Sequence, residues 1–104
     1  MRFLAQATIP NESGNAFCVD KEMNRKMEAI LSEVRPEQVY FGIENGQRCL
    51  FCIVNVDGGH DLPRIAEPLW LGLKADVKFT PVMNTEEFKK ATSTIESAGK
   101  RFNW

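Results

Sequence analysis

The chain has 104 residues, of which 43% are hydrophobic and 26% charged, and its formal net charge is −1 at neutral pH. This size and composition are typical of one globular domain with one core, so we expect a single domain over residues 1–104. There is no basic excess for binding nucleic acid, and no apolar run approaches the ~18 residues that a membrane span needs. Three cysteines in a chain that is not Cys-dense favour a reducing, cytoplasmic setting over a disulfide scaffold.

The first third of the chain predicts a strand, a loop and a helix. Residues 2–9 alternate in polarity, as half-buried strands do. Residues 11–15 (Asn-Glu-Ser-Gly-Asn) have loop-forming chemistry. Between residues 16 and 34, apolar side chains recur every three or four positions. This spacing predicts one amphipathic helix, with Ser13 or Asn15 as its N-cap.

The middle of the chain predicts a β-hairpin. Two β-rich runs, 38–44 and 47–56, are joined by Asn45-Gly46, a strong hairpin signal because both turn positions need positive φ. This turn places Tyr40 opposite Phe51. One face of the hairpin should then be apolar and lie under the helices: Val39, Phe41, Ile43, Leu50, Cys52 and Val54. The other face mixes aromatic, apolar and polar groups: Gln38, Tyr40, Glu44, Gln47, Cys49, Phe51, Ile53 and Asn55.

The last part of the chain predicts a helix, a strand and a final helix. The first of these helices starts near Asp61, and Pro68 should kink it or divide it into two short pieces. Residues 76–82 alternate and predict the fourth strand. Asn84-Thr85-Glu86-Glu87 resembles a capping box, which predicts a last helix from this point, and Gly99 is a suitable C′ residue to end it.

The resulting order, β-α-β-β-α-β plus a C-terminal helix, predicts an α+β fold of the ferredoxin-like type with an antiparallel four-stranded sheet. Helices cover only one face of such a sheet. The other face should carry Tyr40, Phe51 and Ile53, an apolar cluster that is costly to leave in water. A second copy of the chain, related by a two-fold axis, is the simplest cover, so we expect a homodimer through the non-helix face.

A family resemblance adds to this expectation. Its residues are Ile9-Pro10 with Glu12 and Gly14-Asn15-Ala16, Pro36-Glu37 with Tyr40-Phe41, Asn45-Gly46-Gln47-Arg48, and Ile65-Ala66-Glu67-Pro68 leading into Pro81-Val82-Met83. With these the chain resembles the dimeric α/β-barrel superfamily and, more closely, a group of small uncharacterised bacterial proteins. The resemblance implies two ferredoxin-like protomers packed sheet to sheet around a cavity. That superfamily includes muconolactone isomerases, cofactor-free oxygenases, haem-degrading enzymes and non-enzymatic members, so the resemblance selects no reaction.

Polar side chains on the non-helix face form the candidate ligand site. Tyr40 and Glu44 share this face by strand parity, and Gln6 and Thr8 should join them from the neighbouring strand. A few polar groups among apolar walls suit a small-molecule pocket, but the same groups also suit a dimer interface. Asn15, at a helix start, could orient an anionic group or simply cap the helix.

Three further features each have a functional and a structural interpretation. Cys49 and Cys52 match a C-x-x-C pattern, but three positions apart in one strand they lie ~10 Å apart on opposite faces. No disulfide can join them without backbone movement, so we interpret them as packing residues. His60 is a weak candidate for a general base and suits a solvated loop. Arg48, on the helix side of the hairpin tip, could meet a carboxylate of a ligand or partner, or form a surface ion pair.

The leading hypothesis is a cytoplasmic homodimer with a small-molecule cavity on the non-helix face. If it is an enzyme, we expect a cofactor-free isomerase or oxygenase with no metal, in which Tyr40 and Glu44 are the acid and base and Gln6 and Asn15 orient the substrate. The alternative is a non-enzymatic ligand-binding or structural dimerisation module. Binding of nucleic acid is disfavoured because the sheet lacks paired exposed aromatics and a basic surface.

Overall fold

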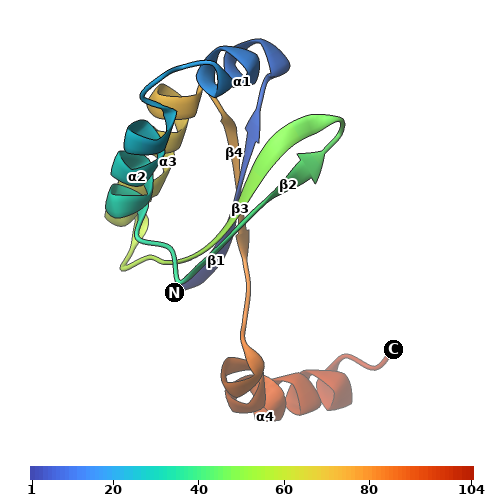
Figure 1. Cartoon of the computed structure of the whole chain (residues 1–104). Helices are drawn as coiled ribbons and strands as arrows, with labels where there is room; N and C mark the ends of the chain where they lie inside the picture. Colours follow the sequence, from blue (N-terminus) through green and yellow to red (C-terminus); the bar gives the residue numbers. More distant parts are fainter.

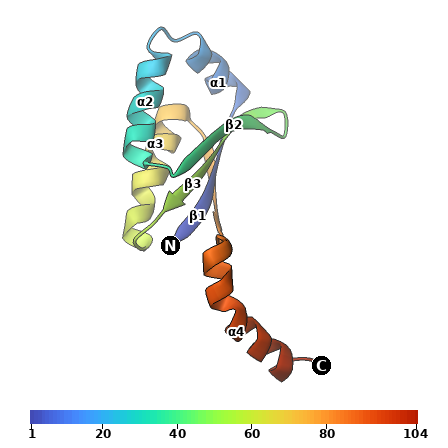
Figure 2. The same cartoon turned by 60° about the horizontal axis from the view of Figure 1, so that its bottom comes forward.

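The computed structural model describes residues 1–104 and contains one open, four-stranded antiparallel sheet. Its strands are β1 (Arg2–Ile9), β2 (Gln38–Glu44), β3 (Gln47–Asn55) and β4 (Asp76–Pro81), in the order β2-β3-β1-β4. The helices α2 (Met23–Val34) and α3 (Leu62–Leu73) lie side by side on one face, and α1 (Asn11–Cys18) lies beyond the end of β1 (Figures 1 and 2). The chain is thus a mixed α+β protein, compatible with the ferredoxin-like plan.

The hairpin has the register that its turn predicts. Asn45 and Gly46 both have positive φ, 51° and 71°, and Tyr40 pairs with Phe51. Pairing of β1 with β3 and β4 extends this register over the sheet. The face without helices, called the open face below, contains three cross-strand rows: Gly42–Cys49–Thr8–Asp76, Tyr40–Phe51–Gln6–Lys78, and Gln38–Ile53–Leu4–Thr80.

The core lies between the other face of the sheet and the two packed helices. Its buried side chains come from the central strands and from both helices: Ala5, Ala7, Leu50, Cys52, Val54, Ile30, Val34, Ile65, Leu69 and Leu73. Small alanines on β1 let the helices approach the sheet closely. Gly72 does the same between the helices, since a Cβ there would lie 2.7 Å from Ile30 Cδ1. The apolar sides of α2 and α3 therefore form the helix layer of the core.

Pro68 does not divide α3, which is continuous from Leu62 to Leu73, so of the two expected outcomes, a kink or two short pieces, the division into two pieces is wrong. The missing N–H removes one hydrogen bond of the helix. Ile65, Leu69 and Leu73 lie on one side of the helix, before and after Pro68, and all three are buried in the core. Burial on both sides of the proline keeps the two halves of the helix on the same surface.

The expected single helix over residues 16–34 is wrong as well, because the structure contains two helices here. The first, α1, begins at Asn11 inside the expected loop; Pro10 is its N-cap, and the Gly14 N–H donates to the Pro10 carbonyl at 2.8 Å. Asp20 lies in the break between α1 and α2. Its carboxylate accepts hydrogen bonds from the Glu22 N–H at 2.8 Å and from the Lys26 ammonium. An aspartate bonded to nearby backbone in this way competes with helix formation.

The last helix, α4 (Thr85–Arg101), leaves the rest of the protein at the end of β4 (Figures 1 and 2). The expected capping box is present: Asn84 Oδ1 accepts from the Glu87 N–H, and Glu87 accepts from the Asn84 N–H. The helix runs past Gly99, so this glycine does not end it. None of its residues is buried, and the radius of gyration is 17.2 Å, against about 13 Å for a compact chain of this length. No helix is both long enough and apolar enough to cross a membrane.

Candidate functional site

A groove of about 560 Å³ lies on the helix side of the sheet, between α1, the start of α2 and the β2–β3 hairpin. Nine of its 13 lining residues are hydrophobic. The main apolar walls come from four different elements: Ile9, Phe17, Met23, Met27, Phe41 and Ile43. A groove of this size and composition suits a small, mostly apolar molecule.

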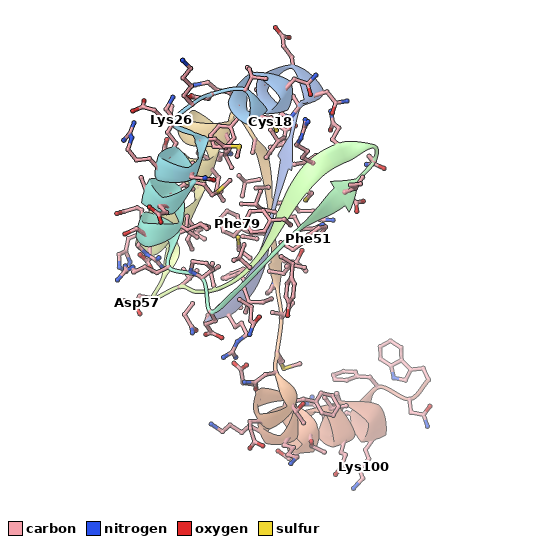
Figure 3. The ribbon with its side chains drawn as sticks, in the orientation of Figure 1. Cys18, Lys26, Phe51, Asp57, Phe79 and Lys100 are labelled. Carbon is pink, nitrogen blue, oxygen red and sulfur yellow. The ribbon has the colours of Figure 1, made fainter.

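The break between α1 and α2 explains why this groove is open. Over most of the sheet the two packed helices bury the strands, but no helix covers the tip of the hairpin. There Phe41 and Ile43 point to the helix side and yet are 62% and 77% exposed. Figure 3 shows Cys18, at the end of α1, near this end of the domain and Asp57 at the opposite end. The exposed apolar side chains of Phe41 and Ile43 therefore lie at this end of the domain, beside the groove.

Arg48 supplies the only charged side chain of the groove lining. Its Nη1 donates a hydrogen bond to Asn15 Oδ1 at 3.0 Å, and it belongs to none of the ion pairs in the structure. Gly14 makes room for it, because a Cβ at that position would lie 2.8 Å from Arg48 Nη1. The guanidinium is thus held at the groove with donors free, an arrangement that suits a carboxylate.

The structure divides the sequence-predicted ligand residues between two places. Asn15 lies at the groove, where it contacts Arg48. Gln6, Thr8 and Tyr40 lie together on the open face, on the other side of the sheet. Thr8 Oγ1 is 3.7 Å from Cys49 Sγ. Gln6, Thr8 and Tyr40 line none of the three main pockets of the structure.

The two residues expected to act as acid and base, Tyr40 and Glu44, lie on the same strand. Glu44 is the last residue of β2, at the hairpin tip, and both side chains are exposed. No hydrogen bond joins them. Four positions along one strand separate their backbones by ~13 Å, so only a molecule that spans this distance could contact both side chains.

His60 lies in the short helix η1 (Gly59–Asp61), at the end of the domain away from the groove, and is exposed. Its neighbour Asp61 receives two hydrogen bonds from Arg64, at 2.9 and 3.1 Å. Arg64 also donates to the carbonyls of Val34 at 2.6 Å and Asn55 at 2.8 Å. The Arg64 hydrogen bond and the Asp57 N–H lower the pKa of Asp61 to about 2. The hydrogen bonds of Asp61 and Arg64 join α2, β3 and α3. These two residues therefore have a structural role.

The thiols also differ in position. Cys49 and Cys52 are both buried and belong to opposite faces of β3, as strand parity predicts. Burial raises the pKa of the Cys52 thiol to about 11, which makes it a poor nucleophile. Cys18 is exposed and lines the groove. No group of three or more His, Cys, Asp or Glu side chains gathers in a way that could hold a metal ion.

Sequence reasoning located part of the groove and missed the rest. Arg48 was placed correctly on the helix side of the hairpin tip. Gly14 falls in the predicted loop and Phe17 lies off the apolar stripe of the predicted helix, so neither is expected at a groove. Met23 and Met27 fall on the apolar stripe of the helix predicted between residues 16 and 34, and in the structure they line the groove. One signal for the groove was available in the sequence: the apolar pair Phe41 and Ile43. These residues lie close to the hairpin tip, beyond the part of the hairpin that one layer of packed helices can cover.

Comparison of the chain with protein-family models, with curated proteins and with solved structures finds no match. The fold and the groove define a class of protein on their own: a small α+β domain with an apolar groove and a free guanidinium at the groove. The residues and geometry of this chain are therefore the basis for assigning a function.

Proposed function

We propose that this domain binds a small, largely apolar carboxylate in the groove, as a ligand-binding module without chemistry of its own. The apolar part of the ligand would contact Phe17, Met27 and Phe41, and its carboxylate would contact Arg48. The observation that carries this proposal is the Arg48 guanidinium, which is fixed by Asn15, has no carboxylate partner in the chain, and borders an apolar cavity.

The energies of such a complex are reasonable. Each buried CH₂ of the ligand contributes about 0.8 kcal/mol. Hydrogen bonds between a guanidinium and a carboxylate add roughly 1.5–3 kcal/mol. After the cost of immobilising the ligand, a chain of six to eight carbons would bind with a Kd on the order of 0.1 mM. The contact between the carboxylate and Arg48 would set the orientation of the ligand. The apolar walls of the groove would provide most of the affinity.

The groove supports binding better than catalysis because its lining has no carboxylate and no imidazole that could transfer a proton. The isomerase or oxygenase hypothesis depends on Tyr40 and Glu44, which lie on the open face. A catalytic site there would need a second molecule to enclose it. The catalytic hypothesis therefore depends on the chain forming a dimer. Catalysis is the second candidate function, after ligand binding.

For the assembly, we propose ferredoxin-like protomers that form a homodimer through the open face, in the cytoplasm. The order of the strands and the placement of both packed helices on one side support the protomer. The open face supports the dimer: Tyr40 is 61% exposed and pairs with Phe51, and Ile53 and Leu4 lie in the next row. The free thiols support a reducing compartment.

The test of the ligand site uses a matched pair of probes, octanoate and octanol. Calorimetric titration of the intact chain should show octanoate binding at least several-fold more tightly than octanol. Arg48→Gln should remove that preference, because it removes the positive charge while keeping a flexible polar side chain with an N–H donor. Arg25→Gln is the control, since Arg25 is an exposed arginine of α2 with its own partner, Glu22.

A second pair of variants locates the site. Tyr40→Phe and His60→Ala should both leave octanoate binding unchanged if the ligand lies in the groove. If Tyr40→Phe weakens octanoate and Arg48→Gln does not, the ligand lies on the open face, as the sequence alone predicted. Equal binding of octanol and octanoate would overturn the role of Arg48.

A further inference from the structure

Helix α4 is amphipathic and has no partner in the chain. Phe88, Ile95 and Phe102 follow one another at seven-residue spacing on one side, and they are 52%, 50% and 57% exposed. Trp104, just beyond the helix, is fully exposed. A helix of this length is marginal on its own in water, and in proteins such helices are stabilised mainly by packing of their apolar side. The apolar stripe of α4 therefore calls for a surface outside its own chain.

The connection to β4 holds α4 away from its own sheet. Only three residues, Val82 to Asn84, separate β4 from α4, and the Val82 N–H donates to the Arg2 carbonyl at 3.2 Å. Beyond this, the Arg2 guanidinium pairs with Glu87 in the first turn of α4. With both ends of the connection tied to β1, the helix points outward and does not lie over the open face (Figures 1 and 2). Figure 3 shows Lys100, near the end of α4, far from the sheet.

The open face is the complementary surface. It presents Tyr40, Phe51, Ile53 and Leu4 in adjacent rows, and it has no cover. Helix α4 has 17 residues and so is ~25 Å long, while β1 has eight residues and is ~26 Å long. One helix can therefore span the open face from end to end.

We propose that α4 is an arm exchanged between two copies of the chain. In a two-fold homodimer, the side of each α4 that carries Phe88, Ile95 and Phe102 packs on the open face of the partner. This inference rests on the proposed homodimer and names the element that covers each open face. That element is helix α4 of the partner, whereas in sheet-to-sheet packing it would be the partner's sheet. Each open face would then be enclosed by a helix, and Tyr40 and Gln6 would become buried beneath it.

The surface that the arms would bury is sufficient for a stable dimer. A fully exposed aromatic side chain offers ~150–250 Å², so the half-exposed phenylalanines, Ile95 and Trp104 together present roughly 400 Å² per arm. With an equal area on the sheet and two arms in the dimer, about 1,600 Å² would be buried. That is the standard size of a specific protein–protein interface, ~1,600 Å².

The experiment is a complementation test with the intact chain. An arm variant, Phe88→Ser with Ile95→Ser, removes the apolar stripe while helix propensity changes little. A sheet variant, Tyr40→Glu with Phe51→Gln, makes the open face polar. The matched control is Lys90→Ser with Thr94→Ser, on the opposite side of α4. Circular dichroism establishes that each variant is folded, and sedimentation at tens of micromolar gives its mass.

We expect the wild type and the control to be dimers, and the arm and sheet variants to be monomers when each is alone. Mixed in equal amounts, the two variants should form a dimer, because the intact arm of the sheet variant can pack on the intact sheet of the arm variant. Recovery of dimer only in the mixture is a signature of exchange, since sheet-to-sheet packing predicts no such recovery. If either double variant fails to fold, the single changes Ile95→Ser and Tyr40→Glu replace it.

The contrary outcomes separate the two proposals. A wild-type monomer would overturn both the homodimer and the arm. A wild-type dimer whose arm variant dimerises equally well would overturn the arm and leave the homodimer through the open face in place. Two monomeric variants that stay monomeric when mixed would also overturn exchange.

Discussion

The Arg2 guanidinium of β1 forms an ion pair with the Glu87 carboxylate in the first turn of α4. The same carboxylate accepts a hydrogen bond from the Asn84 N–H at 2.9 Å, and Arg2 also approaches Glu37 at 3.4 Å. The Asn84 N–H and then Arg2 lower the pKa of Glu87. One carboxylate thus both caps the last helix and fixes its direction relative to the first strand.

Glu87→Gln should loosen the start of α4 while the sheet stays intact. The amide can still accept from the Asn84 N–H, but it loses the charge that attracts Arg2 and the favourable interaction with the helix N-terminus. Hydrogen exchange should become faster at the first turn of α4 and stay unchanged in β1 and β3. Glu86→Gln, on the neighbouring exposed residue, is the control. Unchanged exchange at the first turn would show that the capping geometry alone holds the helix.

Asp61 should make the protein lose stability in acid. Its pKa is about 2 in the folded protein, against 3.8 for the free group, so the folded state favours the charged form. The contribution of Asp61 is therefore complete above pH ~4 and is lost as the pH falls towards 2. Urea unfolding of Asp61→Asn and of the wild type should differ at pH 6 and converge near pH 2. A difference that stays constant over that range would contradict this assignment.

Gly14→Ala should weaken the binding of octanoate without unfolding the protein. The new Cβ would lie 2.8 Å from Arg48 Nη1, the end of a flexible side chain, which can move away. Alanine also favours the helix by roughly 1 kcal/mol, so the melting temperature should not fall. We expect a several-fold increase in Kd for octanoate and no change for octanol. A parallel loss for both probes would mean that the groove itself has narrowed.

Gly72→Ala and Gly99→Ala should change stability in opposite directions. A Cβ at Gly72 would lie 2.7 Å from Ile30 Cδ1 in the buried contact of α2 with α3, and overpacking of this kind costs about 1–3 kcal/mol. At Gly99 no atom lies within 4 Å of a new Cβ, so alanine should stabilise α4 by up to about 1 kcal/mol. Chemical denaturation measures the first change, and hydrogen exchange within α4 measures the second. Ile30→Val should partly rescue Gly72→Ala, because it removes the atom in contact.

Local chemistry determined much of the fold from the sequence. Asn45-Gly46 fixes the register of the hairpin, because positive φ at both residues permits one type of tight turn. Strand parity then assigns Tyr40, Phe51 and Gln6 to one face, and the capping box at Asn84 starts the last helix. These features depend on residues a few positions apart, so the sequence alone is sufficient to predict them.

Tertiary packing decided what the sequence left open. Pro68 stays within a continuous α3 because Ile65 and Leu73 are buried on either side of it. Asp20 separates α1 from α2, and this break leaves the hairpin tip uncovered and creates the groove. The pairing of Arg48 with Asn15, and of Arg2 with Glu87, joins residues 33 and 85 positions apart. Contacts over such separations depend on where whole elements pack, and the local pattern of a sequence does not contain that information.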